Sequence, residues 1–251
     1  MIPARKSRWF RRWFAGHAVS RMRATFESVE IAGVAHLRDA LANGPVVVVS
    51  NHVTWWDPLV TLVLTERVVP CDSYALMNAA NLTRLPFFGL IGAVGVDLTN
   101  PRDGAAAVLH CARLLNGPGR LVWVYPQGRE RPSTVRPLGF RGGSAEIARV
   151  SKAVTVPIAL RYEFMATERP RLFIDIGEAL APERDVTKAI AAHERAVTEG
   201  LDRIERALLD ERTDAYEAVI RAPVSAMGKL AERMLAWMTA PRAMAKLPAR
   251  T

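Results

Sequence analysis

The sequence predicts an α/β fold in which a central, mainly parallel or mixed sheet is flanked by helices, with an N-terminal amphipathic helix and a helical C-terminal extension. Three observations support this prediction. Short apolar runs, of which Val46–Val49 is the clearest, have the length and β-branched character of strands buried on both faces. Segments with helical periodicity, such as Asp103–Leu115, separate these runs. Strands that alternate with helices are typical of a sheet that helices cover.

The individual elements follow from these patterns. Helices are expected at Val34–Leu41, Pro58–Thr65, Asp103–Leu115, Gly143–Ser151 and Val186–Arg212. Strands are expected at Val46–Val49, Ser73–Met77, Val94–Leu98, Leu121–Tyr125, Val154–Arg161 and Arg171–Ile176. A last helical segment is expected at Pro223–Met238. The chain is therefore divided into an N-terminal helix (residues 1–30), a main domain (31–180) and a helical C-terminal extension (181–251).

The N-terminal segment combines basic and aromatic residues within a strongly basic chain. The formal net charge is +9 and the pI is about 10.2, which favours an anionic partner. At 100° per residue, one side of a helix carries Trp9, Phe10, Trp13 and Phe14, with Lys6 intruding, and the other side carries Arg5, Arg8, Arg11 and Arg12. Aromatic rings opposite arginines suit an anionic membrane surface. The alternative is a helix that packs on its own domain with a solvated basic face.

Several classes of protein are not expected. No segment has the roughly 20 apolar residues that a membrane span requires, and no secretory signal is recognisable. No nucleic-acid-binding motif accompanies the positive charge, so no nucleic-acid partner is expected. Cys71 and Cys111 match no metal-ligand spacing, and no metal site or cofactor is predicted. The expected location is the cytoplasmic face of a membrane, as a peripheral protein.

The segment from Ser50 to Pro58 holds the candidate catalytic residues. His52 follows the buried strand directly, and Asp57-Pro58 is typical of a helix start. A loop this short can bring the carboxylate of Asp57 to one ring nitrogen of His52, leaving the other nitrogen free to accept a proton from an alcohol. The alternative is structural, because Asp57 could serve only as a helix cap and His52 as an ordinary polar residue at a strand end. No Gly-x-Ser-x-Gly motif supplies a serine nucleophile.

The order of four short motifs resembles the glycerolipid acyltransferase family, which includes the 1-acylglycerol-3-phosphate acyltransferases. The four motifs, within Val46–Tyr162, are Asn51-His52 with Asp57-Pro58, Leu85-Pro86-Phe87-Phe88-Gly89 with Gly95-Val96-Asp97, Tyr125-Pro126-Gln127-Gly128, and Val156-Pro157-Ile158. The resemblance implies an αβ acyltransferase domain at residues 31–180. It also implies an acyl-CoA or acyl-carrier-protein donor, with His52 and Asp57 as catalytic residues. The expected substrate-binding residues are Asn51, Thr54, Asp97, Tyr125, Pro126, Gln127, Gly128, Arg129, Arg131 and Arg141.

Departures from the family pattern concern the acceptor. The family usually has Arg after the second-motif Asp and Glu in the third motif, whereas this chain has Leu98 and Gln127, and Glu130 replaces an Arg. A neutral Gln127 suits a polyol hydroxyl, which favours an acceptor without a terminal phosphate. The alternative is that Arg129, Arg131, Arg136 and Arg141 rebuild a phosphate site.

The sequence therefore predicts an O-acyltransferase that moves a fatty acyl group from a thioester to a hydroxyl of a lipid-like acceptor, with a His-Asp general base. The alternative is a non-catalytic member of the family that binds membrane or lipid. The acceptor, the acyl chain length, the type of donor and the oligomeric state stay open.

Overall fold

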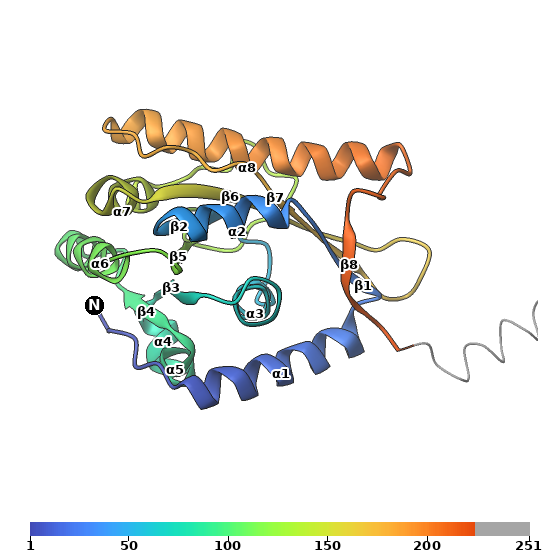
Figure 1. The fold of residues 1–251 in the computed structure, drawn as a ribbon, viewed down its shortest axis with the longest axis horizontal. Coiled ribbons are helices and arrows are strands. Elements are labelled where there is room, and N and C mark those ends of the chain that lie inside the picture. The colour runs from blue at the N-terminus through green and yellow to red at the C-terminus, as the bar shows by residue number, and fades with distance from the viewer. Residues whose placement is uncertain (224–251) are drawn as a thin grey trace, which may run out of the picture.

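The structure is a computed structural model that describes residues 1–223 (Figure 1). Its helices are α1 (Arg8–Thr25), α2 (Val34–Asn43), α3 (Asp57–Val63), α4 (Ala79–Arg84), α5 (Phe87–Ile91), α6 (Pro101–Leu114), α7 (Gly143–Ser151) and α8 (Val186–Leu209), with a π-helical turn, η1 (Leu64–Val68), after α3. Its strands are β1 (Ser28–Ala32), β2 (Val46–Ser50), β3 (Asp72–Asn78), β4 (Ala93–Val96), β5 (Arg120–Val124), β6 (Val154–Glu163), β7 (Arg171–Ile176) and β8 (Glu217–Arg221). Apart from Pro223, the helical segment expected at Pro223–Met238 lies outside the described residues.

Within the described part of the chain, eight strands form one mixed sheet in the order β4-β3-β5-β2-β6-β7-β1-β8. The strands from β4 to β6 pair in parallel, while β7 runs antiparallel to β6 and β8 runs antiparallel to β1. This arrangement confirms the predicted fold class. Two strands at one side of the sheet were not predicted: β1 begins within the segment expected to be the N-terminal helix, and the edge strand β8 lies in the extension expected to be helical.

The central strand β2 shows why the sheet is covered on both faces. Val46 and Val48 pack into a core with α1, α2 and α3, while Val47 and Val49 pack into a second core with α6, α7 and α8. Successive side chains of a strand point to opposite faces, so a run of four valines fills both cores at once. Figure 1 shows α1 and α8 on opposite sides of the sheet.

The parallel strands bring their carboxyl ends to one edge of the sheet. His52 follows β2, Tyr125 follows β5, and the last residues of β3 and β6 end at the same edge. Segments that are far apart in the sequence thereby supply side chains to one region, which is where open α/β sheets usually bind their ligands.

Helix α1 differs from the expected pattern at Arg11. The side chain is buried, with Nη2 2.5 Å from Oε1 of Glu66 and 3.0 Å from Oγ of Ser73. The reason is periodicity, because the stripe that α1 buries against the domain consists of Arg11, Ala15, Ala18 and Met22. Arg11 therefore does not belong to the exposed basic face, and Lys6 is likewise turned inward to Asp72 and over the ring of Tyr74. A helix that could cross a bilayer is absent from residues 1–223.

Candidate active site

The centre of the site is the contact between His52 and Asp57. Nδ1 of His52 lies 2.7 Å from Oδ2 of Asp57, so the short loop between β2 and α3 brings the two side chains together as expected. A carboxylate can only accept, so the proton lies on Nδ1 and the lone pair of Nε2 faces away from Asp57. This is the tautomer in which Nε2 can take a proton from a hydroxyl group.

Asp57 is fully buried and held by hydrogen bonds at both oxygens. Oδ2 also accepts the backbone N–H groups of Val53 (2.6 Å) and Thr54 (3.1 Å). Oδ1 accepts the hydroxyl of Tyr162 (2.6 Å) from the end of β6. These donors come from the loop and from β6, so among the described residues Asp57 does not act as a cap for the N–H groups of α3. The structure thus favours the orienting role of Asp57 over the helix-cap alternative.

Tyr162 and Tyr125 complete the surroundings of the pair. Burial, followed by the charge of Asp57, raises the pKa of Tyr162 well above its ordinary value, so its hydroxyl stays protonated and donates. The ring of His52 stacks on Tyr125 with centroids 4.5 Å apart. The hydroxyls of Tyr125 and Thr61 lie 2.6 Å apart, and both reach the backbone carbonyl of Asp57 at 3.0 and 3.1 Å. The start of α3 is therefore fixed relative to the histidine ring.

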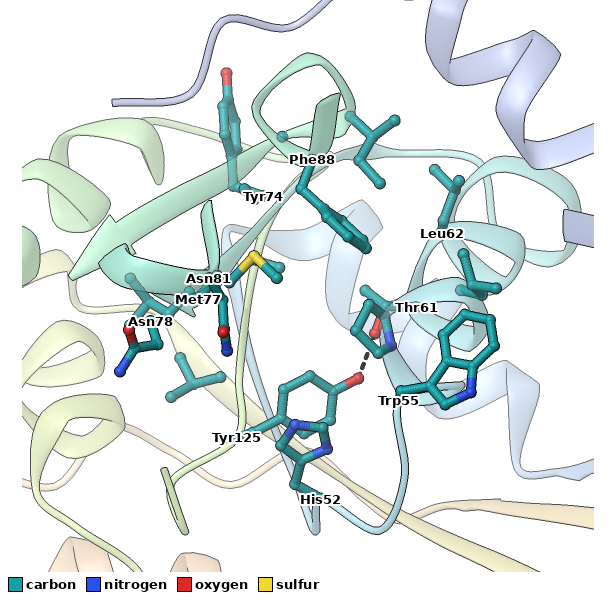
Figure 2. Close-up of a pocket in the computed structure, with 18 of the residues that line it drawn as sticks. His52, Trp55, Thr61, Leu62, Tyr74, Met77, Asn78, Asn81, Phe88 and Tyr125 are labelled. Carbon is teal, nitrogen blue, oxygen red and sulfur yellow. Dashed lines mark hydrogen bonds between the residues drawn. The ribbon is translucent and has the colours of Figure 1, made fainter. Parts of the chain in front are cut away.

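His52 lines a cavity of about 550 Å³ (Figure 2). Much of its wall is apolar and comes from α1, α3, α5 and the strands β3 and β4, including Phe14, Leu59, Leu62, Met77, Phe88 and Ile91. Around His52 the lining is polar, with Glu130 and the arginines Arg129 and Arg141. The cavity thus joins a proton-accepting nitrogen to a space suited to a long apolar group.

Six of the predicted site residues line this cavity. They are His52, Tyr125, Pro126, Gly128, Arg129 and Arg141. Thr54 does not line the cavity and contributes its backbone N–H to Asp57. Arg131 does not line it either, and its guanidinium donates to the carbonyl of Leu138 at 3.1 Å. These two residues support the site rather than face a substrate.

Three expected substrate-binding residues are occupied elsewhere. Both amide atoms of Asn51 bond the backbone of Leu160 at 2.8 Å, so this buried side chain joins β2 to β6 and has no free polar atom for a substrate. Gln127 is buried and accepts the N–H of His52 at 2.6 Å while donating to Leu138 at 3.3 Å. Asp97 is exposed outside the cavity and accepts two hydrogen bonds from Thr99. None of these three side chains lines the cavity in this structure, so the contact of Gln127 with a polyol hydroxyl stays a prediction.

Two residues of the site, Tyr162 and Trp55, were not predicted from the sequence. No local pattern marks Tyr162, because its contact with Asp57 depends on the register of β6 beside β2. Trp55 lines the cavity close to His52 and lies in the same loop, so its position in the sequence was a usable signal. No group of three or more His, Cys, Asp or Glu side chains within residues 1–223 is arranged to bind a metal ion.

Comparisons with known proteins identify the family and the fold. A family model described as Acyltransferase matches residues 28–161. A solved structure of the 1-acyl-sn-glycerophosphate (LPA) acyltransferase PlsC from Thermotoga maritima is similar in fold, with a TM-score of 0.55 and 17% sequence identity over 78% of this chain and 82% of that chain. No curated protein matches the chain. Because the family model covers more than half of the sequence, this chain belongs to the acyltransferase family.

Proposed function

We propose that this chain is an O-acyltransferase that moves a fatty acyl group from an acyl thioester, either acyl-CoA or acyl carrier protein, to a hydroxyl of a lipid-like acceptor. The observation that carries the proposal is the position of the His52–Asp57 pair at one end of a largely apolar cavity. A hydroxyl held at Nε2 and a thioester whose chain fills the cavity would meet at this end.

In this proposal His52 acts first as a base and then as an acid. Nε2 takes the proton of the acceptor hydroxyl while the hydroxyl oxygen attacks the thioester carbon. The carbon–sulfur bond of the resulting tetrahedral intermediate then breaks, and the leaving sulfur takes the proton from Nε2. Asp57 holds the ring and stabilises its charged form between these two steps. No cofactor is required, because the thioester itself supplies the activated acyl group.

The apolar wall is assigned to the acyl chain. Phe14 of α1 and Phe87 of α5 have ring centroids 5.4 Å apart, and both line the cavity. The arginines near its mouth, Arg84, Arg129 and Arg141, suit the phosphate groups that both kinds of thioester carrier contain. A chain could thus lie along α3 and α5 while the thioester remains beside His52.

We further propose that the protein binds an anionic membrane through α1. Trp9 is 73% exposed and Trp13 is 53% exposed, with their rings stacked 6.3 Å apart. Arg8 and Arg12 are exposed on the same helix and could meet lipid phosphates. The anionic cytoplasmic leaflet attracts such basic segments, which supports a peripheral location there. Residues 1–30 would then associate with the membrane, residues 31–180 carry the reaction, and residues 181–251 form the extension.

The deciding experiment uses labelled acyl donors. The full chain is incubated with labelled acyl-CoA or acyl carrier protein and a fractionated total lipid extract, and the lipids that gain an acyl group are identified by mass. We expect at least one hydroxyl-bearing lipid to gain label with the wild type and not with His52→Ala. Lipid binding without any transfer of label would instead support a non-catalytic, lipid-binding member of the family.

A further inference from the structure

Glu130 lies beside the reactive nitrogen of His52. Its Oε1 is 3.7 Å from Nε2 of His52. The backbone of His52 fixes this position on both sides, because its carbonyl accepts the N–H of Arg131 at 2.8 Å and its N–H donates to Gln127 at 2.6 Å. Two hydrogen bonds thus hold the segment that carries Glu130 against His52 itself.

Nε2 of His52 and Oε1 of Glu130 both need a hydrogen-bond donor, and neither can supply one to the other. A separation of 3.7 Å is too long for a direct hydrogen bond. In the tautomer that Asp57 imposes, Nε2 of His52 accepts, and a carboxylate accepts as well. Glu130 and His52 therefore cannot satisfy each other. A ligand that satisfies both must bring two donors close together, one for Nε2 and one for the carboxylate.

The charges around the site decide what kind of second donor fits. Of the described residues that line the cavity, Glu130 is the only acidic one, and four arginines line it: Arg21, Arg84, Arg129 and Arg141. None of these arginines forms an ion pair with Glu130 within the described part of the chain. A terminal phosphate next to the reacting hydroxyl would be repelled by Glu130, and a cationic group would meet the arginines. An uncharged hydroxyl avoids both penalties.

An exposed aromatic ring from the loop that carries His52 also lines the cavity. Trp55 lines the cavity and is 56% exposed. Its ring stacks on Trp56 with centroids 4.8 Å apart, and Trp56 packs against the buried Phe26 at 5.1 Å, so the ring of Trp55 is held in place. Figure 2 shows Trp55 and His52 on neighbouring parts of one loop. A sugar ring has an apolar face for such a surface and hydroxyl groups at its edge for Glu130.

We infer that Glu130 selects the acceptor, and that the acceptor is a glycolipid-like polyol whose acylated hydroxyl has a neighbouring hydroxyl. One hydroxyl donates to Nε2 of His52 and gains the acyl group, while its neighbour donates to Glu130. This inference rests on the proposed function and names the acceptor class for the same site. Glu130 thus takes the selective role that the sequence had suggested for Gln127.

The test compares three acceptors: a sugar lipid with two neighbouring free hydroxyls, its deoxy analogue that lacks one of them, and lysophosphatidic acid. We expect the wild type to prefer the diol over the deoxy analogue by about a hundredfold in kcat/KM, since a hydrogen bond to a charged group is lost with the deoxy compound. Lysophosphatidic acid should be poorer than the diol. Glu130→Ala should lower kcat/KM for the diol and leave the deoxy analogue within about threefold of the wild type.

The matched control is Glu178→Ala. Glu178 is exposed and lines a separate hollow with Pro45 and Lys152, beside the start of β2 rather than its end. Its kinetics should equal those of the wild type with all three acceptors. Because Glu130 is itself largely exposed, Glu130→Ala should melt at the wild-type temperature, which separates selection from unfolding.

Three results would overturn the inference while leaving the acyltransferase activity intact. They are equal kcat/KM values for the diol and its deoxy analogue, a preference for lysophosphatidic acid, and a Glu130→Ala defect of the same size with every acceptor. The second result would mean that the arginines have rebuilt a phosphate site. If none of the acceptors, nor any lipid of a total extract, gains an acyl group, the proposed function fails and the inference fails with it.

Discussion

The hydroxyl of Tyr162 donates a 2.6 Å hydrogen bond to Oδ1 of Asp57, although the two residues are 105 positions apart. Tyr162 comes from the end of β6, while the other oxygen of Asp57 is held by the loop that carries His52. The carboxylate is therefore fixed from two separate parts of the chain. A carboxylate held in this way presents one oxygen to the imidazole in a single orientation.

Tyr162→Phe should lower kcat about tenfold with little change in KM, because one hydrogen bond that positions Asp57 is lost and no cavity-lining atom is removed. Steady-state kinetics with the identified acceptor would measure kcat and KM separately. The matched control is Tyr216→Phe. The hydroxyl of Tyr216 also donates to a carboxylate, that of Asp175, at 2.9 Å, but Tyr216 packs in the core on the α8 side of the sheet. A wild-type kcat for Tyr162→Phe would show that the loop alone positions Asp57.

Catalysis should depend on both members of the pair. His52→Ala is expected to remove nearly all transfer, and Asp57→Asn should lose on the order of a hundredfold or more, because an amide no longer enforces the tautomer with a free Nε2. Single-turnover rates with labelled donor would measure both losses. His36→Ala is the control, because His36 bonds the carbonyl of Ile176 away from the cavity. A folded His52→Ala protein with near-normal turnover would rule out the mechanism.

The sequence predicted those parts of the fold whose signals are local. The helix Gly143–Ser151 and the strand Arg171–Ile176 have the predicted bounds, and the four valines of β2 marked the centre of the sheet. The strands β1 and β8 were missed, since they pair with each other from opposite ends of the described chain. Such pairings depend on tertiary context rather than on local pattern.

The sequence predicted only the part of the site whose residues lie in a single loop, which is the His52–Asp57 pair. The contact between His52 and Asp57 spans five positions, so the spacing allowed it and the resemblance to the acyltransferase family favoured it. The third motif was harder, because the sequence does not show which of its side chains turn toward the backbone of His52. Gln127, which was expected to meet the acceptor, turns toward the backbone of His52, while Glu130 lines the cavity.

Membrane association should depend on Trp9 and Trp13. Replacing both with Ser should release the protein from anionic vesicles, because burial of their rings in the interface is lost. High salt should weaken binding of the wild type only partly, since ring burial is not screened. Sedimentation with vesicles that contain anionic lipid would measure both effects.

The choice of variants follows from the packing of α1. Deleting residues 1–26 would remove Met22 and Phe26 from the core, so a truncation would confuse unfolding with membrane release. Leu209→Ser is the control, because Leu209 is 77% exposed at the end of α8, on the opposite side of the sheet (Figure 1). If the Trp9→Ser/Trp13→Ser protein sediments as fully as the wild type, another surface binds the membrane.

His193 gives the fold a dependence on pH that is separate from catalysis. The side chain is buried between α8 and α7, with Nδ1 3.5 Å from Oγ of Ser144. Burial disfavours the charged imidazole and lowers the pKa of His193 from 6.5 to about 4. Between these two values the unfolded chain binds a proton that the folded chain does not.

The contribution of the neutral, buried His193 to the free energy of unfolding should therefore be complete above about pH 6.5 and should shrink as the pH drops toward 4. Between pH 7 and pH 5 the loss from this one group is about 2 kcal/mol in the free energy of unfolding. Other groups titrate in this range too, so the measurement compares wild type with His193→Asn, whose amide does not titrate and can still bond Ser144. Urea unfolding at the two pH values should show a drop that is about 2 kcal/mol smaller for the variant. Equal drops in the two proteins would mean that His193 becomes protonated without unfolding, through water that reaches the space between α7 and α8.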